Sequence, residues 1–106
     1  MAKFIKITKL LSIGNPASFY EDQKDEFVYI RPRDVSKIYH REHQSCSSRK
    51  FVDGKWNETE FKSNYTDIDT YKDGTIRTLM DTDEVIDMIN TALEEEEIRY
   101  TELYKK

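Results

Sequence analysis

Two histidines and the single cysteine recur every third residue, at His40, His43 and Cys46. Imidazole and thiolate groups are good zinc ligands, and a cysteine near a histidine can also form a nucleophile and its base. A structural zinc site needs a fourth ligand, however, and no feature of the sequence around Cys46 would activate its thiol. We therefore predict neither a metal site nor a catalytic site here, and we expect both histidines to face solvent.

A second segment, from Asp69 to Met80, matches part of the calcium-binding loop pattern, with aspartates at its first and fifth positions and Gly74 at its sixth. The third and twelfth positions hold Tyr71 and Met80, which removes most of the carboxylate ligands that calcium needs. The sequence also contains no glycine-rich phosphate loop and no nucleophile elbow. These absences predict a protein that is not an enzyme and that binds no cofactor.

A basic segment spans residues 31–50, where Lys and Arg outnumber Asp and Glu by six to two. Basic side chains on a strand with interleaved aromatic residues can follow a phosphate backbone and stack on bases. The same charges could bind an acidic protein surface, including the acidic half of this chain, or could simply be solvated. The candidate partner-binding residues of this segment are Arg31, Arg33, Lys37, Tyr39 and Arg41.

The charge of the chain is divided unevenly along its 106 residues, which carry a net charge of −4. Residues 1–50 hold ten Lys/Arg and six Asp/Glu, a balance of +4, whereas residues 51–106 hold seven and fifteen, a balance of −8. The overall acidity argues against a dedicated nucleic-acid binder. The asymmetry would allow head-to-tail self-association into a homo-oligomer, although the halves of a sequence need not form the halves of a surface.

The N-terminus and the cysteine count bear on the cellular compartment. Residues 1–7 alternate charged and apolar side chains and lack the apolar core of a secretory signal. No stretch approaches the roughly 20 apolar residues of a membrane-spanning helix. One cysteine cannot form an intramolecular disulfide, which is typical of a reducing compartment. We expect a cytoplasmic protein without a membrane partner, located in the host cytoplasm or the virion if a phage encodes it.

Apolar and alternating runs predict strands at residues 3–11, 27–31, 35–41, 65–71 and 75–80, with a loop over 14–26. The last two strands form a hairpin in which Gly74 takes the left-handed conformation and Asp69 pairs with Arg77. Between residues 42 and 64, the turn signal Asp53-Gly54 favours either a small hairpin or an inserted flap.

A helix is predicted from Asp81 or Thr82 to about residue 104, with Asp81 and Glu84 as an N-terminal capping pair. Such a helix would be about 34 Å long at 1.5 Å per residue, which exceeds the width of the sheet. Residues 98–106 would therefore form a C-terminal extension, either a frayed tail or a helix that docks onto a partner. The candidate partner-binding residues there are Ile98, Tyr100, Leu103 and Tyr104.

These elements predict a single α+β domain over residues 1–106, with a small, mostly antiparallel sheet of five or six strands packed against one C-terminal helix. An aromatic content of 12% is typical of an ordered domain rather than a disordered chain. The predicted core contains Phe4 or Ile5, with Ile7, Leu10, Val28, Ile30, Ile38, Ile68, Ile76, Val85, Ile89 and Leu93.

Three parts of the sequence resemble a small bacterial family linked to flagellar operons and swarming motility: residues 4–10, residues 29–38, and residues 73–76 together with 83–89. The resemblance covers about half of the chain and implies the order strand, loop, strand, strand, hairpin, helix. This chain departs from it by the insertion at 42–64 and by the C-terminal extension. Short proteins of this layout also resemble ones encoded by phages and mobile elements. The resemblance implies architecture only, because a fold does not imply a function.

The function that we expect from the sequence is that of a non-enzymatic protein–protein interaction or assembly subunit, encoded by a phage. Its contact surfaces would be the apolar stripe at 98–104 and the basic segment at 31–50. The alternative is a nucleic-acid-binding regulator that uses the same basic segment.

Overall fold

The computed structural model describes the backbone of residues 4–104 and the side chains as far as residue 96. The described residues form seven strands in two sheets and one helix, so the predicted α+β class is confirmed. The strands are β1 (Ile5–Ile7), β2 (Leu10–Leu11), β3 (Ala17–Tyr20), β4 (Val28–Ile30), β5 (Val35–Val52), β6 (Lys55–Thr70) and β7 (Gly74–Thr78). Two 3-10 turns, η1 (Glu21–Gln23) and η2 (Pro32–Asp34), precede the C-terminal helix α1 (Thr82–Tyr104).

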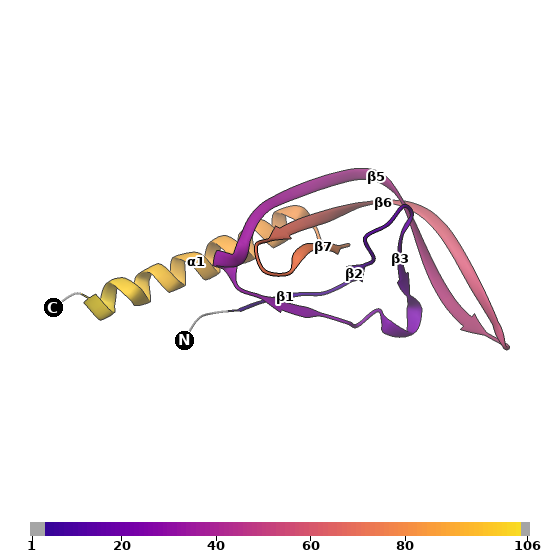
Figure 1. Ribbon diagram of the computed structural model, residues 1–106, viewed down its shortest axis with the longest axis horizontal. Helices are drawn as coiled ribbons and strands as arrows, with labels where there is room; N and C mark the ends of the chain where they lie inside the picture. Colours follow the sequence, from indigo (N-terminus) through magenta and orange to yellow (C-terminus); the bar gives the residue numbers. More distant parts are fainter. Residues whose placement is uncertain (1–3, 105–106) are drawn as a thin grey trace.

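The larger sheet has the strand order β2-β7-β6-β5-β3, and its pairs are antiparallel except for β3 beside β5. Strands β1 and β4 form a separate antiparallel pair. Figure 1 shows α1 leaving the sheets at one end of the molecule, while the β5–β6 hairpin extends at the other. The molecule is accordingly elongated, with principal extents of 65 × 26 × 21 Å.

The β5–β6 hairpin is the longest element of the sheet. The strand predicted to end at Arg41 continues to Val52, and residues 42–64 form the outer half of the hairpin. The turn between the strands contains only Asp53 and Gly54, whose φ angles are 51° and 76°. A two-residue turn with both φ angles positive has the twist that matches paired strands, and Asp-Gly is a favoured sequence for it.

A β-bulge divides this hairpin into an inner and an outer half. Arg41 pairs with Tyr65 and Gln44 pairs with Ser63, so two residues of β5 lie opposite the single residue Asn64. The bulge residue His43 has a φ of 52°. In an uninterrupted strand, residues an even number of positions apart point to the same face. The extra residue in β5 reverses this alternation, so His40 and Cys46, which lie on either side of the bulge, point to opposite faces.

The N-terminal region differs from the prediction of a single strand over residues 3–11. Lys9 has a φ of 53°, and this turn separates β1 from β2, which join different sheets. The predicted loop over 14–26 contains β3, which lies parallel to residues Cys46–Arg49 of β5. Strand β3 is short and has no strict polar–apolar alternation, so its sequence alone carries no strand signal.

The predicted hairpin at residues 65–80 is present as β6 and β7, but its register is shifted by two residues. Asp67, rather than Asp69, pairs with Arg77, and Gly74 has the predicted positive φ of 71°. A shift of two residues preserves the face on which each side chain lies. Ile68 and Ile76 therefore still face the core together.

The main core lies between the sheets and the first turns of α1. Of the predicted core residues, Ile5 is 5% exposed whereas Phe4 is 49% exposed, so Ile5 is the core member. The cluster also contains Met80 and Ala92, which the prediction lacked. The predicted residues that are buried in it are Ile5, Ile7, Ile30, Ile68, Val85 and Ile89, and those packed against it are Leu10, Val28, Ile38, Ile76 and Leu93.

A second, smaller core lies beneath the outer part of the hairpin. It consists of Leu11, Ala17, Cys46 and Tyr65, with Phe19, Phe61 and Leu79 packed against it. This cluster fastens β3 to β5 and β6. It was not predicted, because it depends on the β3–β5 pairing and on the bulge that turns Cys46 towards Tyr65.

Candidate functional site

Three aromatic side chains are exposed together at the free end of the β5–β6 hairpin, and we name Tyr20, Phe51 and Trp56 the tip cluster. Their exposed fractions are 40%, 58% and 60%. The ring centroids of Phe51 and Trp56 are 5.2 Å apart, and those of Tyr20 and Trp56 are 5.5 Å apart, both in edge-to-face geometry. The cluster contributes to neither buried core.

The positions of the tip cluster follow from the register of the hairpin. Phe51 pairs directly with Trp56 one step before the two-residue turn, so both rings lie on one face. Tyr20 ends β3, where it pairs with Arg49 of β5 and reaches the same face. The backbone pairing thus brings the three rings to one face, and their outer surfaces remain in water.

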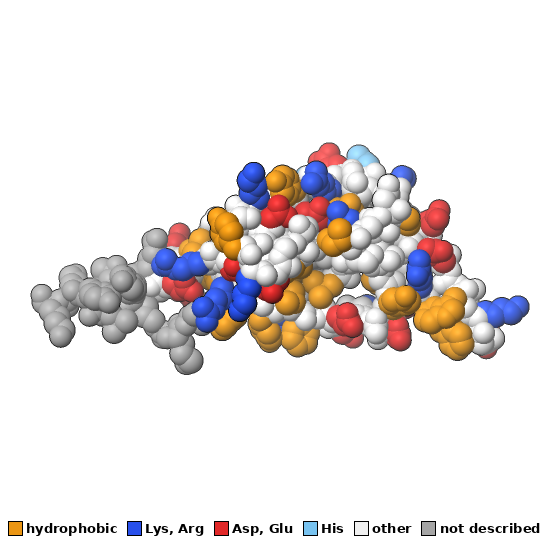
Figure 2. All heavy atoms as spheres, viewed as in Figure 1, with side chains coloured by type: hydrophobic (Ala, Val, Ile, Leu, Met, Phe, Trp, Pro, Cys, Tyr) orange, Lys and Arg blue, Asp and Glu red, His pale blue; other side chains and the backbone are white. Residues whose placement is uncertain are grey.

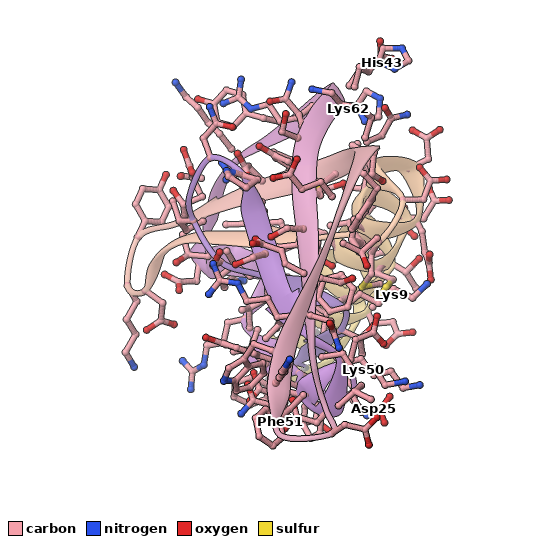
Figure 3. All side chains as sticks on the ribbon, turned by 90° about the vertical axis from the view of Figure 1, so that its right-hand side faces the viewer. Lys9, Asp25, His43, Lys50, Phe51 and Lys62 are labelled. Carbon is pink, nitrogen blue, oxygen red and sulfur yellow. The ribbon has the colours of Figure 1, made fainter. Side chains whose placement is uncertain are left out.

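Basic side chains flank the tip cluster. Lys50 and Lys55 are exposed next to Phe51 and Trp56 in sequence, and the Arg49 guanidinium lies 6.0 Å from the centre of the Tyr20 ring. Figure 3, which looks onto this end of the molecule, shows Phe51 and Lys50 at the end of the hairpin. In Figure 2, apolar side chains gather at the same end beside a basic side chain. The tip therefore presents an apolar surface on one face of the hairpin, with Arg49 beside it and with Lys50 and Lys55 on the opposite face.

A groove lies between β1 and the start of α1, with a volume of about 670 Å³. Four carboxylates line it, one from Asp81 just before α1 and three from the first turns of α1, and apolar side chains from both elements line the rest. We name it the acid-rimmed groove. Its lining consists of Phe4, Ile5, Lys6, Asp81, Asp83, Glu84, Asp87, Met88, Thr91 and Ala92.

The acidic rim also has a structural role at the start of the helix. The Asp81 carbonyl accepts the first helical hydrogen bond from the Val85 amide at 3.0 Å, and its side chain accepts one from the Asp83 amide at 3.3 Å. Asp81 is therefore the N-cap, as the sequence predicted. Asp83 and Glu84 in the first turn stabilise the positive end of the helix dipole. Asp87, one turn further on, has no such role.

The predicted basic residues are divided between elements: Lys37, Tyr39 and Arg41 share one face of β5, whereas Arg31 and Arg33 lie at η2. Arg33 lies in η2 and donates a hydrogen bond from Nε to Glu96 Oε2 of α1 at 3.0 Å. Arg41 lies 3.4 Å from the buried Asp67 carboxylate and stacks over the ring of Tyr39 at 4.8 Å. Lys37 is exposed on β5. Two of the three arginines thus already bind carboxylates of this chain.

The third arginine, Arg31, belongs to a different surface at the β1–β4 pair. Its guanidinium lies 5.5 Å from the centre of the Phe4 ring, and Lys6 lies 4.1 Å from the centre of the Phe27 ring. Phe27 and Tyr29 are 48% and 55% exposed. This face alternates aromatic and cationic groups, which the sequence did not reveal because residues 4–6 and 27–31 are far apart in the chain.

The other predicted surface, the stripe at 98–104, lies on the last turns of α1. The backbone is helical as far as Tyr104, as predicted. The side chains of Ile98, Tyr100, Leu103 and Tyr104 lie outside the described residues.

The structure separates His40, His43 and Cys46. His40 is exposed on the helix side of the sheet, where its Nδ1 lies 2.8 Å from Thr82 Oγ1. His43 is exposed at the bulge, and Cys46 is buried on the opposite face with Tyr65. Within the described part of the chain, no three His, Cys, Asp or Glu side chains are grouped so that they could hold a metal ion.

Burial raises the pKa of the Cys46 thiol, although the nearby charges of Arg77 and Lys62 oppose the shift. We expect a thiol reagent to modify Cys46 at least about 100-fold more slowly in the native protein than in denaturant, because reaction requires local opening. Labelling at pH 8 with a chromogenic disulfide measures both rates. A native rate close to that of the unfolded chain would contradict this burial.

The same pKa shift predicts a pH dependence of stability. The unfolded thiol loses its proton near its ordinary pKa of about 8.5, below the raised pKa of the folded state. The contribution of Cys46 to stability is therefore complete below that value and declines as the pH rises further. The Cys46→Ala variant lacks this contribution, so comparing it with the wild type measures the contribution. Above about pH 8.5 the free energy of unfolding of the variant should fall less per pH unit than that of the wild type.

No family model matches the chain, and no curated protein or solved structure is significantly similar to it. The resemblance to the flagellar-operon family stays a prediction. Among the described residues, no helix is both long and apolar enough to cross a membrane.

Proposed function

We propose that this protein is a non-enzymatic assembly subunit, encoded by a phage, and that it binds another protein chain through the tip cluster. The observation that carries the proposal is the exposure of Tyr20, Phe51 and Trp56 at the end of an extended hairpin. Aromatic side chains and arginine are enriched in protein interfaces, and tryptophan and tyrosine are among the residues that contribute most to binding there. Burying them on a partner would remove apolar surface from water at a low cost in conformational entropy.

The tip cluster contributes little to folding. Exposed aromatic side chains that lie outside the buried cores each stabilise a fold by about 1 kcal/mol or less. The Phe51→Ser/Trp56→Ser variant should therefore keep its circular dichroism spectrum and most of its free energy of unfolding. Any binding that it loses can then be attributed to the removed surface.

The proposal can be tested by photo-cross-linking from the tip. A benzophenone amino acid at position 51 should form adducts with protein, in the purified sample or in an extract of the cells that produce the chain. The same group at position 71 is the matched control, because Tyr71 is 78% exposed at the β6–β7 turn. Mass spectrometry identifies the adducts. If position 51 gives no more protein adducts than position 71, the proposal is wrong.

The second candidate function is nucleic-acid binding, and the aromatic and cationic face of β1 and β4 favours it. Aromatic rings stack on bases, and cations beside them bind phosphates. Arg33 and Arg41 already bind carboxylates of Glu96 and Asp67, which argues against a role for these two arginines in binding nucleic acid. Salt-sensitive binding of a single-stranded oligonucleotide that Arg31→Ala and Lys6→Ala weaken would favour this candidate instead.

A further inference from the structure

We propose that the acid-rimmed groove receives the tip cluster of a second copy of this chain. The inference rests on the proposed function, since it names the partner that the tip cluster binds. It joins two surfaces of one sequence that are complementary in chemistry and separate in space.

The two surfaces match in polarity. The tip cluster offers the rings of Phe51 and Trp56, and the groove offers the half-exposed Phe4 and the partly buried Met88, with the buried Ile5 behind them. A groove of about 670 Å³ lies within the usual range for sites that enclose a ligand, roughly 300–1,000 Å³. It can therefore accommodate aromatic side chains at the end of a narrow hairpin.

The two surfaces also match in charge. Arg49 lies on the same face of the hairpin as the rings, where it pairs with Glu58 at 3.7 Å. The exposed Lys50 and Lys55 lie on the opposite face of this narrow end, next to the turn that contains Asp53. The groove carries four carboxylates and one lysine, Lys6. Residues 49–58 at the end of the hairpin hold three cations and two carboxylates, so the end carries a small positive balance on its two faces. A hairpin end that enters the groove would bring these cations near the groove carboxylates, which favours association. The opposite pairing, tip against tip, would place lysines next to lysines.

The contact must form between copies, because the two surfaces lie apart in one molecule. The tip cluster is at the free end of the hairpin, whereas the groove is formed by β1 and the start of α1, in the middle of the molecule in Figure 1. The rigid pairing of β5 with β6 prevents the tip from folding back. Since tip and groove are different surfaces, a growing assembly always has one tip and one groove unoccupied, and further copies can add to them. The alternative is a closed dimer in which each copy places its tip in the groove of the other.

The test uses one variant of each surface. The tip variant is Phe51→Ser/Trp56→Ser, and the groove variant is Glu84→Lys/Asp87→Lys, whose residues are exposed on α1. Tyr71→Ser is the matched control for a lost aromatic side chain at a turn. Asn90→Lys/Glu94→Lys is the matched control for two lysines introduced on α1 outside the groove. Circular dichroism establishes that each variant is folded.

Light scattering over a concentration series should show that the wild type and both controls self-associate, more strongly at low than at high salt. Each surface variant should raise the dissociation constant by about 30-fold or more. Trp56 is the only tryptophan, so its emission reports burial of the tip directly. The emission of the wild type should shift to shorter wavelength as the concentration rises.

Mixing the two variants supplies the decisive measurement. The tip variant keeps an intact groove and the groove variant keeps an intact tip, so an equimolar mixture should form a complex of two chains although neither variant associates alone. A second variant, Lys50→Glu/Lys55→Glu, should be monomeric alone and should associate with the groove variant, whose charges it complements.

The inference is wrong if the wild type is a monomer at both salt concentrations, or if folded surface variants associate as strongly as their controls. It is also wrong if the folded variants fail to combine in the mixture. A monomeric wild type whose position 51 cross-links to a different protein would overturn this inference and leave the proposed function intact. Absence of any protein adduct from position 51 would overturn both.

Discussion

Replacing Arg77 by methionine is expected to lower the free energy of unfolding by about 3 kcal/mol, because it leaves a buried carboxylate without its main partner. The Asp67 side chain is only 4% exposed. Arg77 donates hydrogen bonds from Nε and Nη2 to its two oxygens at 2.8 and 3.1 Å. The hydrogen bond to Asp67 raises the pKa of the Arg77 guanidinium further above its ordinary value, so the guanidinium keeps its charge.

Arg77 is fixed from two further sides. Its Nη1 donates to the Gly14 carbonyl at 3.0 Å, and its guanidinium lies 4.4 Å from the centre of the Tyr65 ring. Methionine would preserve some packing on Tyr65 but would satisfy neither Asp67 nor Gly14. Since a buried group that loses its charged partner bears the full cost of desolvation, the loss should appear in urea unfolding followed by circular dichroism.

Two companion variants separate this charge effect from a loss of packing. Arg41→Met removes the half-exposed arginine at 3.4 Å from Asp67 and should cost less than about 1 kcal/mol. Asp67→Leu/Arg77→Met removes both charges and should recover much of the stability, because an apolar pair of similar volume is often nearly as stable as a buried ion pair. If Arg77→Met costs no more than Arg41→Met, the assignment of Arg77 as the principal partner is incorrect.

Truncating Ile68 to alanine is expected to cost about 3–4 kcal/mol of unfolding free energy. Ile68 is fully buried in the centre of the larger sheet, where it pairs with Ile38 on one side and Ile76 on the other. Its face packs against the main core beneath α1. The removed methyl and methylene groups would leave a cavity that paired strands on both sides cannot close.

The matched control is Ile13→Ala, which removes the same atoms from a side chain that is 58% exposed. It should change the free energy of unfolding by less than about 0.5 kcal/mol. Urea midpoints and slopes measured side by side give both values. Equal losses at the two positions would contradict the placement of Ile68 at the centre of the core.

The parts of the fold that local patterns specify were predicted well. The helix and its Asp81 cap follow from apolar spacing and capping chemistry, and the positive φ at Gly74 follows from the turn sequence. The six buried isoleucine and valine positions follow from the same periodicities. Each of these features depends on residues within a few positions of each other along the chain, so the local sequence pattern is enough to predict it.

The parts that depend on distant pairings were not predicted. Strand β3 gains its backbone partners only from β5, and a single left-handed residue, Lys9, divides the first predicted strand between two sheets. The tip cluster shows the same limit. Phe51 and Trp56 flank a recognisable Asp-Gly turn, but the sequence does not show that the turn ends an eighteen-residue strand or that Tyr20 lies beside it.

The bulge at His43 gives this protein a way to change its reach during evolution without changing its chemistry. His43 has no partner of its own in β6, because two residues of β5 lie opposite Asn64. If β5 lost His43, all the pairs that β5 makes with β6 from Arg41 to Val52 could be kept. Bulges bend the strand that carries them, and Figure 1 shows the hairpin changing direction along its length. A single-codon deletion there would straighten the arm and redirect the rings at its end. A lineage could in this way alter what the arm reaches, while the aromatic residues themselves stayed the same.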